Sequence, residues 1–409
     1  MEILHFSDLH LGVENYGRLD PGTGLNSRLG DFLHALDRVV ECAIERHVDL
    51  VLFTGDAYNS RRPNPTYQRE FARRIQRLAG SGVQVFLLAG NHDKPNTPGR
   101  ATSLDIFATL QVEGVHVAEQ LGTRRLATRR GDVQVVALPW VTRSQLLTRE
   151  EYKNKSPEEV NAIIVDKLTQ LLATEIAALD SSVPAVLAMH GSVHGGTFGS
   201  ERSAMLGQEI VFPLGLVADP AFDYVALGHL HKHQVLRDDP PVVYSGSLER
   251  VDFGEEKEKK GYILVEINDG KTSWSFQDSD ARPFVTIDVT VGEHDPMPAV
   301  RAAIDECDIR DAIVRVLVHL TSEQEALLDD GQIRRWLSDA FRVTAVARDV
   351  DRPVRMRLGN RGSVEKMTPD QLLVLYLEAK NVDAKRIDTL ARYARAVFAG
   401  DDGSEAISQ

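Results

Sequence analysis

The sequence predicts a layered α/β domain, followed by a small α/β cap domain and a C-terminal helical hairpin. Three observations lead to this prediction. Residues 1–281 alternate short apolar segments with amphipathic ones, as strands and helices do in α/β folds. After Arg282-Pro283, residues 282–348 repeat the alternation on a smaller scale. Residues 368–399 then carry a helix start signal and two apolar stripes.

The first domain is expected to contain buried strands, because several short segments are rich in Val, Leu and Ile. These strands are Glu2–Phe6, Val48–Phe53, Val83–Ala89, Pro184–Met189 and Asp223–Leu227. Two amphipathic helices are expected at Leu29–Arg46 and Tyr67–Leu78. Packing on their own sheet is the favoured interpretation of both stripes, and a dimer interface is the alternative. Glu255–Lys260 is interpreted as a charged loop between strands Val242–Ser245 and Tyr262–Ile267.

The cap domain is expected to follow a strand–helix–strand–helix–strand order. Its elements are Phe284–Val291, Pro298–Cys307, Ala312–Leu320, Gly331–Ala340 and Arg342–Arg348. Residues 349–367 contain little apolar content and are expected to be a linker, and residues 400–409 are expected to be disordered. Between them, Thr368, Pro369 and Gln371 predict the start of a helical hairpin that breaks at Asn381. The hairpin either docks on its own body or binds a partner, and a partner is favoured.

Composition indicates a globular protein of the reducing cytoplasm. Among 409 residues there are two cysteines, and neither belongs to a zinc-binding pattern. No apolar run approaches the ~18 residues of a membrane helix, and Glu2 and His5 argue against a signal peptide. The net charge of -13 argues against binding nucleic acid over the whole surface. A local basic patch is still possible, since Arg61, Arg62, Arg69, Arg73, Arg74 and Arg77 are clustered.

Short polar signatures follow the predicted strands directly. They are Asp8-Leu9-His10, Gly55-Asp56, Gly90-Asn91-His92-Asp93, His190-Gly191 and Gly228-His229-Leu230-His231. Sites in α/β folds form beyond the carboxyl ends of strands, where loops can direct side chains to one point. Taken alone, Asp8 could cap a turn and Asn91 could hold a left-handed conformation, and His34 and His47 are interpreted as ordinary helix or surface histidines. The ordered set as a whole predicts a pair of metal ions.

The residue types also indicate which chemistry is expected. Carboxylate, amide and imidazole ligands without cysteine favour catalytic transition metals over a structural zinc site. A carboxylate such as Asp56 can bridge two metals, which would activate water for in-line attack on phosphorus. His92 is the candidate that protonates the leaving oxygen, and Asp93 beside it is expected to orient the imidazole.

The series of motifs resembles that of the calcineurin-like metallophosphoesterase superfamily. Finer features resemble the SbcD-type DNA double-strand-break repair nucleases: residues 5–12 (HFSDLHLG), residues 54–56 with 60–65 (TGD, SRRPNP), and residues 244–254 (YSGSLERVDFG). The resemblance covers nearly the whole chain, including the cap and the hairpin. It implies a layered β-sandwich flanked by helices.

The resemblance also implies a ligand set, partners and an activity. One metal would be held by Asp8, His10, Asp56 and His231, and the other by Asp56, Asn91, His190 and His229. The metal would be Mn²⁺, and the activities would be double-strand exonuclease and single-strand endonuclease. The family forms homodimers through helices of the nuclease domain and binds an SbcC-type ATPase through the terminal hairpin.

One position departs from the family pattern. Some relatives carry a second histidine where this chain has Asn59, which can donate a hydrogen bond to phosphate but cannot transfer a proton near neutral pH. Asn59, Arg61 and Arg62 are therefore candidate DNA contacts, and His92 is left as the proton donor.

Two rival hypotheses are a phosphodiesterase acting on small nucleotides and a structural adaptor. Processing of long duplex DNA would distinguish the nuclease from the first rival, and the expected cap and hairpin argue against that rival. The complete ligand set argues against the second.

Overall fold

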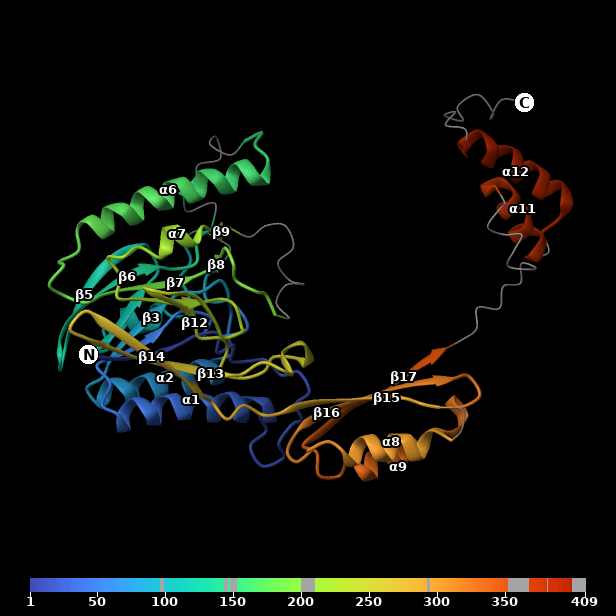
Figure 1. Ribbon diagram of the computed structural model, residues 1–409, viewed down its shortest axis with the longest axis horizontal. Coiled ribbons are helices and arrows are strands. Elements are labelled where there is room, and N and C mark those ends of the chain that lie inside the picture. The colour runs from blue at the N-terminus through green and yellow to red at the C-terminus, as the bar shows by residue number, and fades with distance from the viewer. Residues whose placement is uncertain are drawn as a thin grey trace. The chain divides into compact units, whose positions relative to one another are not determined.

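The structure is a computed structural model that describes most of the chain (Figure 1). The described residues are 1–95, 99–142, 146–147, 153–199, 210–292, 295–351, 368–380 and 382–398. They form two units, of which the larger comprises residues 1–289, 297–318 and 329–347. Most of the expected linker, the expected break at Asn381 and the expected disordered tail lie outside the described residues.

One six-stranded sheet has the order β14-β13-β1-β2-β3-β4. Its strands are β1 (Glu2–Phe6), β2 (Leu50–Phe53), β3 (Gln84–Leu88), β4 (Val115–Ala118), β13 (Gly261–Asn268) and β14 (Lys271–Asp278). Strands β1 to β4 are parallel, so their carboxyl ends share one edge of the sheet. The antiparallel pair β13 and β14 completes the other side.

The second six-stranded sheet has the order β11-β12-β10-β7-β6-β5. Its strands are β5 (Gly122–Thr128), β6 (Gly131–Leu138), β7 (Ala185–His190), β10 (Tyr224–Gly228), β11 (Gln234–Asp238) and β12 (Pro241–Tyr244). The four central strands are parallel, and β5 and β11 are antiparallel edges.

The two sheets pack face to face between layers of helices, as Figure 1 shows. Apolar side chains from both sheets, such as Leu52 and Val186, form the central core. Helices α1 (Ser27–Glu45) and α2 (Pro65–Gly80) cover the outer face of the first sheet, and α6 (Pro157–Ala177) and α7 (Leu214–Val217) cover that of the second. The predicted layered sandwich flanked by helices is therefore confirmed.

The stripes of α1 and α2 pack mainly inward. Phe32, Leu36, Val39 and Phe71 are fully buried in the core beneath the first sheet. The shorter elements of this domain are α3 (Asp105–Thr109), the paired strands β8 (Ser192–Val193) and β9 (Val211–Phe212), and the 3₁₀ helix η2 (Phe253–Glu255). None of the helices among the described residues is long and apolar enough to cross a lipid bilayer.

The cap elements have the predicted order. They are β15 (Phe284–Thr290), α8 (Pro296–Asp305), β16 (Ile313–Thr321), the 3₁₀ helix η3 (Glu325–Leu327), α9 (Asp330–Trp336) and β17 (Arg342–Asp351). The strands form one sheet in the order β15-β16-β17. Helix α9 ends before the expected Ala340, because the next residues form tighter turns: the Ala340 amide donates to the carbonyl of Leu337, three residues back.

Within the larger unit, a group of charged side chains joins α1 to the start of the cap. Asp31 accepts two hydrogen bonds from Arg282, at 2.6 and 2.9 Å, and one from Arg28 at 2.6 Å. Arg28 is fully buried, and Arg282 lies 3.8 Å from the centre of the Phe341 ring. Arg282 thus binds both oxygens of the Asp31 carboxylate, and Arg28 shares one of them, which fixes the orientation of the carboxylate.

The helical hairpin belongs to the second unit. It consists of α11 (Pro369–Ala379) and α12 (Ala384–Phe398). The Thr368 amide donates to the Gln371 side chain at 3.0 Å, as the predicted helix start signal requires. Tyr376, Leu390 and Tyr393 are exposed on the hairpin.

Candidate metal centre

The polar signatures meet where strands of the two sheets end. Asp8 and His10 follow β1, Asp56 follows β2, and Asn91 follows β3. His190 is the last residue of β7, and His229 and His231 follow β10. The sequence folds this way because parallel strands bring their carboxyl ends to one edge, and each strand then exits through a sharp turn.

Backbone hydrogen bonds hold the turns against one another. The amide of Asp8 donates to the carbonyl of Gly55 at 3.0 Å, and that of His10 to the carbonyl of Asp56 at 3.1 Å. The amide of His229 donates to the Asp8 carboxylate at 3.0 Å. These bonds link the turns after β1, β2 and β10, so the side chains on them cannot move independently.

Four of these residues have unusual backbone conformations. The φ angle is 51° at Asp8, 48° at His10, 62° at Asp56 and 107° at His229. Such left-handed conformations cost about 1–2 kcal/mol in a residue with a side chain. Their concentration at one point is typical of a functional site, where the surrounding structure holds strained residues in place.

Two glycines allow the turns to approach closely. A Cβ atom at Gly90 would lie 2.1 Å from Oδ1 of Asp56. A Cβ at Gly55, where φ is +103°, would lie 2.4 Å from Nδ1 of His190. No side chain fits at either position, so glycine is required for the Asp56 carboxylate to reach the centre.

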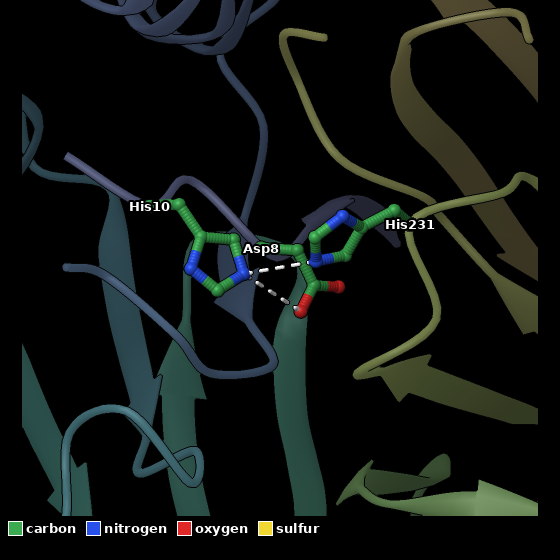
Figure 2. Close-up of side chains that lie close together, drawn as sticks. All are labelled: Asp8, His10 and His231. Carbon is green, nitrogen blue, oxygen red and sulfur yellow. Dashed lines mark hydrogen bonds and ion pairs between the residues drawn. The ribbon is translucent and has the colours of Figure 1, made fainter. Parts of the chain in front are cut away.

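Asp8, His10 and His231 form the first group of possible metal ligands. Figure 2 shows the two imidazole rings and the carboxylate pointing toward one another. Nε2 of His10 lies 3.0 Å from Nε2 of His231 and 4.0 Å from Oδ1 of Asp8. All three side chains are buried. Three potential donor atoms therefore face one small volume.

Asp56, His190 and His229 form the second group. Asn91 lies beside it, because its Oδ1 atom is 2.9 Å from Nε2 of His190 and 3.1 Å from Nδ1 of His229. Asp56 adjoins both groups: its Oδ2 atom is 3.6 Å from Nε2 of His10 and 3.6 Å from Nε2 of His190. The structure thus brings all seven predicted ligands together, with Asp56 in the middle.

The hydrogen bonds of His190 indicate that a cation fits between these atoms. Its Nδ1 lies 2.7 Å from the carbonyl of Thr54, which can only accept, so Nδ1 carries the proton. Burial, and then the charge of His229, lower the pKa of His190 well below its ordinary value, which favours the neutral ring. Its Nε2 lone pair then faces Oδ1 of Asn91 at 2.9 Å, and one divalent cation bound by both atoms would satisfy the two acceptors.

The buried carboxylates also favour a bound cation. Burial, and then the charges of Asp93 and Asp8, raise the pKa of Asp56 well above its ordinary value. Burial also raises the pKa of Asp8. Groups held in this way favour positive charge nearby, and oxygen and imidazole donors without thiolate suit divalent metals.

His92 lies at the side of this centre. Its Nδ1 donates to the carbonyl of Asn59 at 2.9 Å, and its ring stands edge-on to His10, with 4.9 Å between ring centres. His10, Asp56 and His92 also form a possible ligand group, so the position of His92 is compatible with contact to metal as well as to substrate.

The expected role of Asp93 in orienting His92 is wrong. The Asp93 carboxylate is fully buried and accepts from the amides of Asp56 at 2.8 Å, Gly90 at 3.0 Å and Ala57 at 3.1 Å. The Asn59 carbonyl takes the Nδ1 proton of His92 instead. Asp93 therefore joins the turns after β2 and β3 and acts on the position of Asp56.

The arginines of the predicted basic cluster differ in what they contact. Arg61 and Arg62 are both exposed, and Arg61 lies beside the centre, where its Nε donates to the carbonyl of Asn91 at 3.0 Å. Arg69, Arg73 and Arg74 pair with Glu70, and Arg74 also pairs with Asp37 of α1. The arginines of α2 thus form ion pairs within α2 and between α2 and α1, whereas Arg61 and Arg62 are the candidate DNA contacts.

Sequence reasoning missed Glu255 and Lys260, which the expected charged loop contained. Both are buried, and Oε1 of Glu255 lies 2.7 Å from Nδ1 of His231 while Oε2 lies 2.9 Å from Nζ of Lys260. Although burial alone would raise it, the charges of Lys260 and His231 lower the pKa of Glu255 below its ordinary value. A charge run such as EEKEKK usually lies in solvent, so only the proximity of His231 in the fold reveals this role.

A family model described as calcineurin-like phosphoesterase matches residues 1–233. The chain belongs to the calcineurin-like phosphoesterase family. Members are metal-dependent phosphoesterases, and the clustered Asp and His side chains agree with a divalent-metal requirement. The resemblance noted from the motifs is confirmed at this level.

Among curated proteins, the chain is similar to the DNA double-strand break repair protein Mre11 of Haloferax volcanii. The two are 28% identical over 328 residues, which is 80% of this chain and 62% of that protein. The chain therefore spans less than two thirds of that relative's length. Two solved structures are also similar. A dimetal phosphatase from Danio rerio is 10% identical, and the match covers 69% of this chain and 97% of that one. TT1561 of Thermus thermophilus is 14% identical, and the match covers 67% of this chain and 98% of that one. Each has a TM-score of 0.38.

Proposed function

We propose that this protein is a DNA nuclease that depends on two divalent metal ions and works as a homodimer with an SbcC-type ATPase. The observation that carries the proposal is the pair of ligand groups on either side of Asp56. The similarity to a protein named for double-strand-break repair supports DNA as the substrate. Double-strand exonuclease and single-strand endonuclease are the proposed activities, with Mn²⁺ as the proposed metal.

Asp8, His10, Asp56 and His231 would hold one ion, and Asp56, Asn91, His190 and His229 the other. Divalent ions there would activate water for attack on phosphorus and neutralise charge on the phosphate oxygens. The protein's own contribution is to fix the ligands: the carbonyl of Thr54 orients His190, and the carboxylate of Glu255 orients His231. Such outer hydrogen bonds select the tautomer whose free nitrogen faces the metal.

His92 is the proposed proton donor to the leaving 3′ oxygen. Its ring is partly accessible and held at Nδ1 by the carbonyl of Asn59, so Nε2 faces the substrate, and the ring would give up its Nε2 proton from the imidazolium form. Asn59 thus contributes through its backbone carbonyl, and its side chain is exposed. Arg61 and Arg62 would contact the DNA backbone beside the scissile phosphate.

The hairpin α11–α12 is the proposed site of ATPase binding. Tyr376, Leu390 and Tyr393 expose large apolar surfaces on it, as expected for helices that dock on a partner. Removing residues 368–409 should abolish binding of the ATPase and leave the binding of Mn²⁺ unchanged. Retention of ATPase binding by the truncated protein would contradict this assignment.

The decisive experiment is hydrolysis of end-labelled linear duplex DNA by the purified protein with Mn²⁺, with and without the ATPase. His92→Ala serves as the inactive control and His34→Ala, an exposed histidine, as the matched active one. Shortening of DNA that requires Mn²⁺ and His92 supports the proposal. Cleavage of a small phosphodiester but not of DNA under either condition would favour a phosphodiesterase of small nucleotides.

A further inference from the structure

A single turn, residues 252–256, contacts the candidate metal centre on one side and the cap on the other. It contains the 3₁₀ helix η2, Phe253–Glu255. The turn is closed by its own hydrogen bonds, from the Gly254 amide to Oδ1 of Asp252 at 2.7 Å and from the Glu256 amide to the carbonyl of Phe253 at 3.3 Å. Side chains on so short and closed a turn move together.

Toward the metal centre, the turn presents Glu255. Its carboxylate lies 2.7 Å from Nδ1 of His231, and its other oxygen accepts from the Val251 amide at 2.9 Å. With Nδ1 occupied in this way, Nε2 of His231 points at His10 and Asp8 (Figure 2). Glu255 shares its charge between His231 and Lys260, whose Nζ lies 2.9 Å from Oε2 of Glu255 and also donates to Ser247 at 2.8 Å and to the carbonyl of His231 at 3.1 Å.

Toward the cap, the turn presents Phe253 and Glu256. Glu256 accepts hydrogen bonds from the amide of Thr286, at 2.8 Å, and from its hydroxyl, so it holds strand β15 by both groups. Arg315 of β16 donates to the same hydroxyl at 2.8 Å and lies 4.4 Å from the centre of the Phe253 ring. The Phe253 ring packs against Phe284, with 5.0 Å between centres.

We propose that Glu255 is a positioning residue for His231, and that Glu256 couples this position to strand β15 of the cap. A displacement of β15, such as a bound polymer could cause, would move the turn and with it the His231 ring. The coupling rests on the proposed function, in which His231 binds metal. It gives the cap a direct mechanical connection to one of the two metal positions.

The first test is the binding of Mn²⁺ alone, measured by titration calorimetry on the full chain. Glu255→Ala should weaken one of two Mn²⁺ sites by about 10–100-fold, as loss of an outer-shell partner does. Glu255→Gln should restore part of the affinity, because its amide oxygen can still accept from Nδ1 of His231. Equal affinities for wild type, Glu255→Ala and Glu255→Gln would overturn the positioning role.

The second test concerns the coupling to the cap. Glu256→Ala and Thr286→Val each remove part of the contact between the turn and strand β15. Both should weaken the same Mn²⁺ site several-fold, although neither residue contacts a proposed metal ligand. Thr344→Val is the matched control, because it removes a hydroxyl bond of 3.1 Å to Val314 elsewhere in the cap sheet. In the Glu255→Ala background, Glu256→Ala should have no further effect, since both act through one contact.

The outcomes separate this inference from the proposed function. If the wild type binds two Mn²⁺ ions and Glu256→Ala and Thr286→Val bind them with unchanged affinity, the coupling is overturned and the proposed metal centre stands. Absence of Mn²⁺ binding in the wild type would overturn the proposed metal centre itself. Thermal unfolding of each variant shows whether an effect on affinity arises in a folded protein. If Glu255→Ala does not fold, Glu255→Gln, which keeps the size of the side chain, still tests the positioning role by its lower affinity relative to wild type.

Discussion

At the scale of single residues, Asp56 is the side chain on which the proposed centre depends. One carboxylate oxygen lies 3.6 Å from a histidine of each ligand group, and the other accepts from the amide of His92 at 2.8 Å. The carboxylate therefore stands between the group that contains His231 and the group that contains His190. A single substitution here acts on both metal positions.

Asp56→Ala should reduce bound Mn²⁺ from two ions to fewer than one per chain, because both sites lose a ligand. Elemental analysis after dialysis, together with calorimetry, measures the stoichiometry. Asp8→Ala is the matched control, since Asp8 belongs only to the first group, and should leave one ion bound. Two ions retained in Asp56→Ala would contradict a bridging role.

His92→Ala should retain Mn²⁺ and lose hydrolysis by about 10²–10⁴-fold, the usual contribution of a general acid. The reason is that its Nδ1 is taken by the Asn59 carbonyl, which leaves Nε2 for substrate. Initial rates on a small phosphodiester and on duplex DNA, with calorimetry in parallel, check both expectations. Loss of metal in this variant would instead make His92 a ligand.

The sequence predicted the members of the centre but not their supporting contacts. Asp8, Asn91 and His190 stand next to strands, so local pattern was sufficient to select them. The partner of His231 could not be predicted, because Glu255 is 24 positions away and lies in a charge run that is usually solvated. The role expected of Asp93 was wrong since adjacency in sequence does not determine the direction of a side chain in a turn.

At the scale of elements, buried strands were the most predictable features. Strand β1 has the expected bounds, and the other expected strands that carry ligands differ by only a few terminal residues. Their burial on both faces produces continuous apolar runs, which is a strong signal. Pairing order is different: β13 joins β1, although the two strands lie near opposite ends of the domain's sequence, and no local pattern indicates it.

Helix α6 provides a test of local structure. Ser156 accepts from the Glu159 amide at 3.2 Å, and the Glu159 side chain accepts from the Ser156 amide at 2.7 Å, which forms a capping box. Ser156→Ala should lower the free energy of unfolding by about 1 kcal/mol. Urea denaturation measures the change. Thr169→Ala, at an exposed position inside the same helix, should instead raise stability by a few tenths of a kcal/mol.

At the scale of the whole molecule, Asp31 connects α1 with the first residue of the cap. It is the shared acceptor of Arg28 and Arg282. If it were replaced, Arg282 would lose its hydrogen-bonded carboxylate and Arg28 would keep only Glu249, at 3.7 Å. A buried charge without its partner is costly, whereas the intact pair adds little. The net stabilisation by the intact ion pair is therefore small. The cost of removing Asp31 is large, because it leaves buried arginine charge only partly compensated.

Asp31→Asn should lower the free energy of unfolding by about 3 kcal/mol, because Arg282 loses its hydrogen-bonded carboxylate and buried Arg28 keeps only Glu249, at 3.7 Å. Asp280→Asn is the matched control: its side chain is 74% exposed, so a change within about 0.5 kcal/mol is expected. Urea denaturation followed by fluorescence compares the two. Equal stability of both variants would show that the arginines find other partners.

The left-handed backbone at His10 and Asp56 has a consequence for protein engineering. Glycine adopts these conformations without strain, so replacing either residue by glycine removes a conformational penalty while deleting a proposed metal ligand. A library selected for heat resistance alone would therefore enrich inactive clones at these positions. Selection pressure on catalysis has to accompany any search for a more robust form of this enzyme.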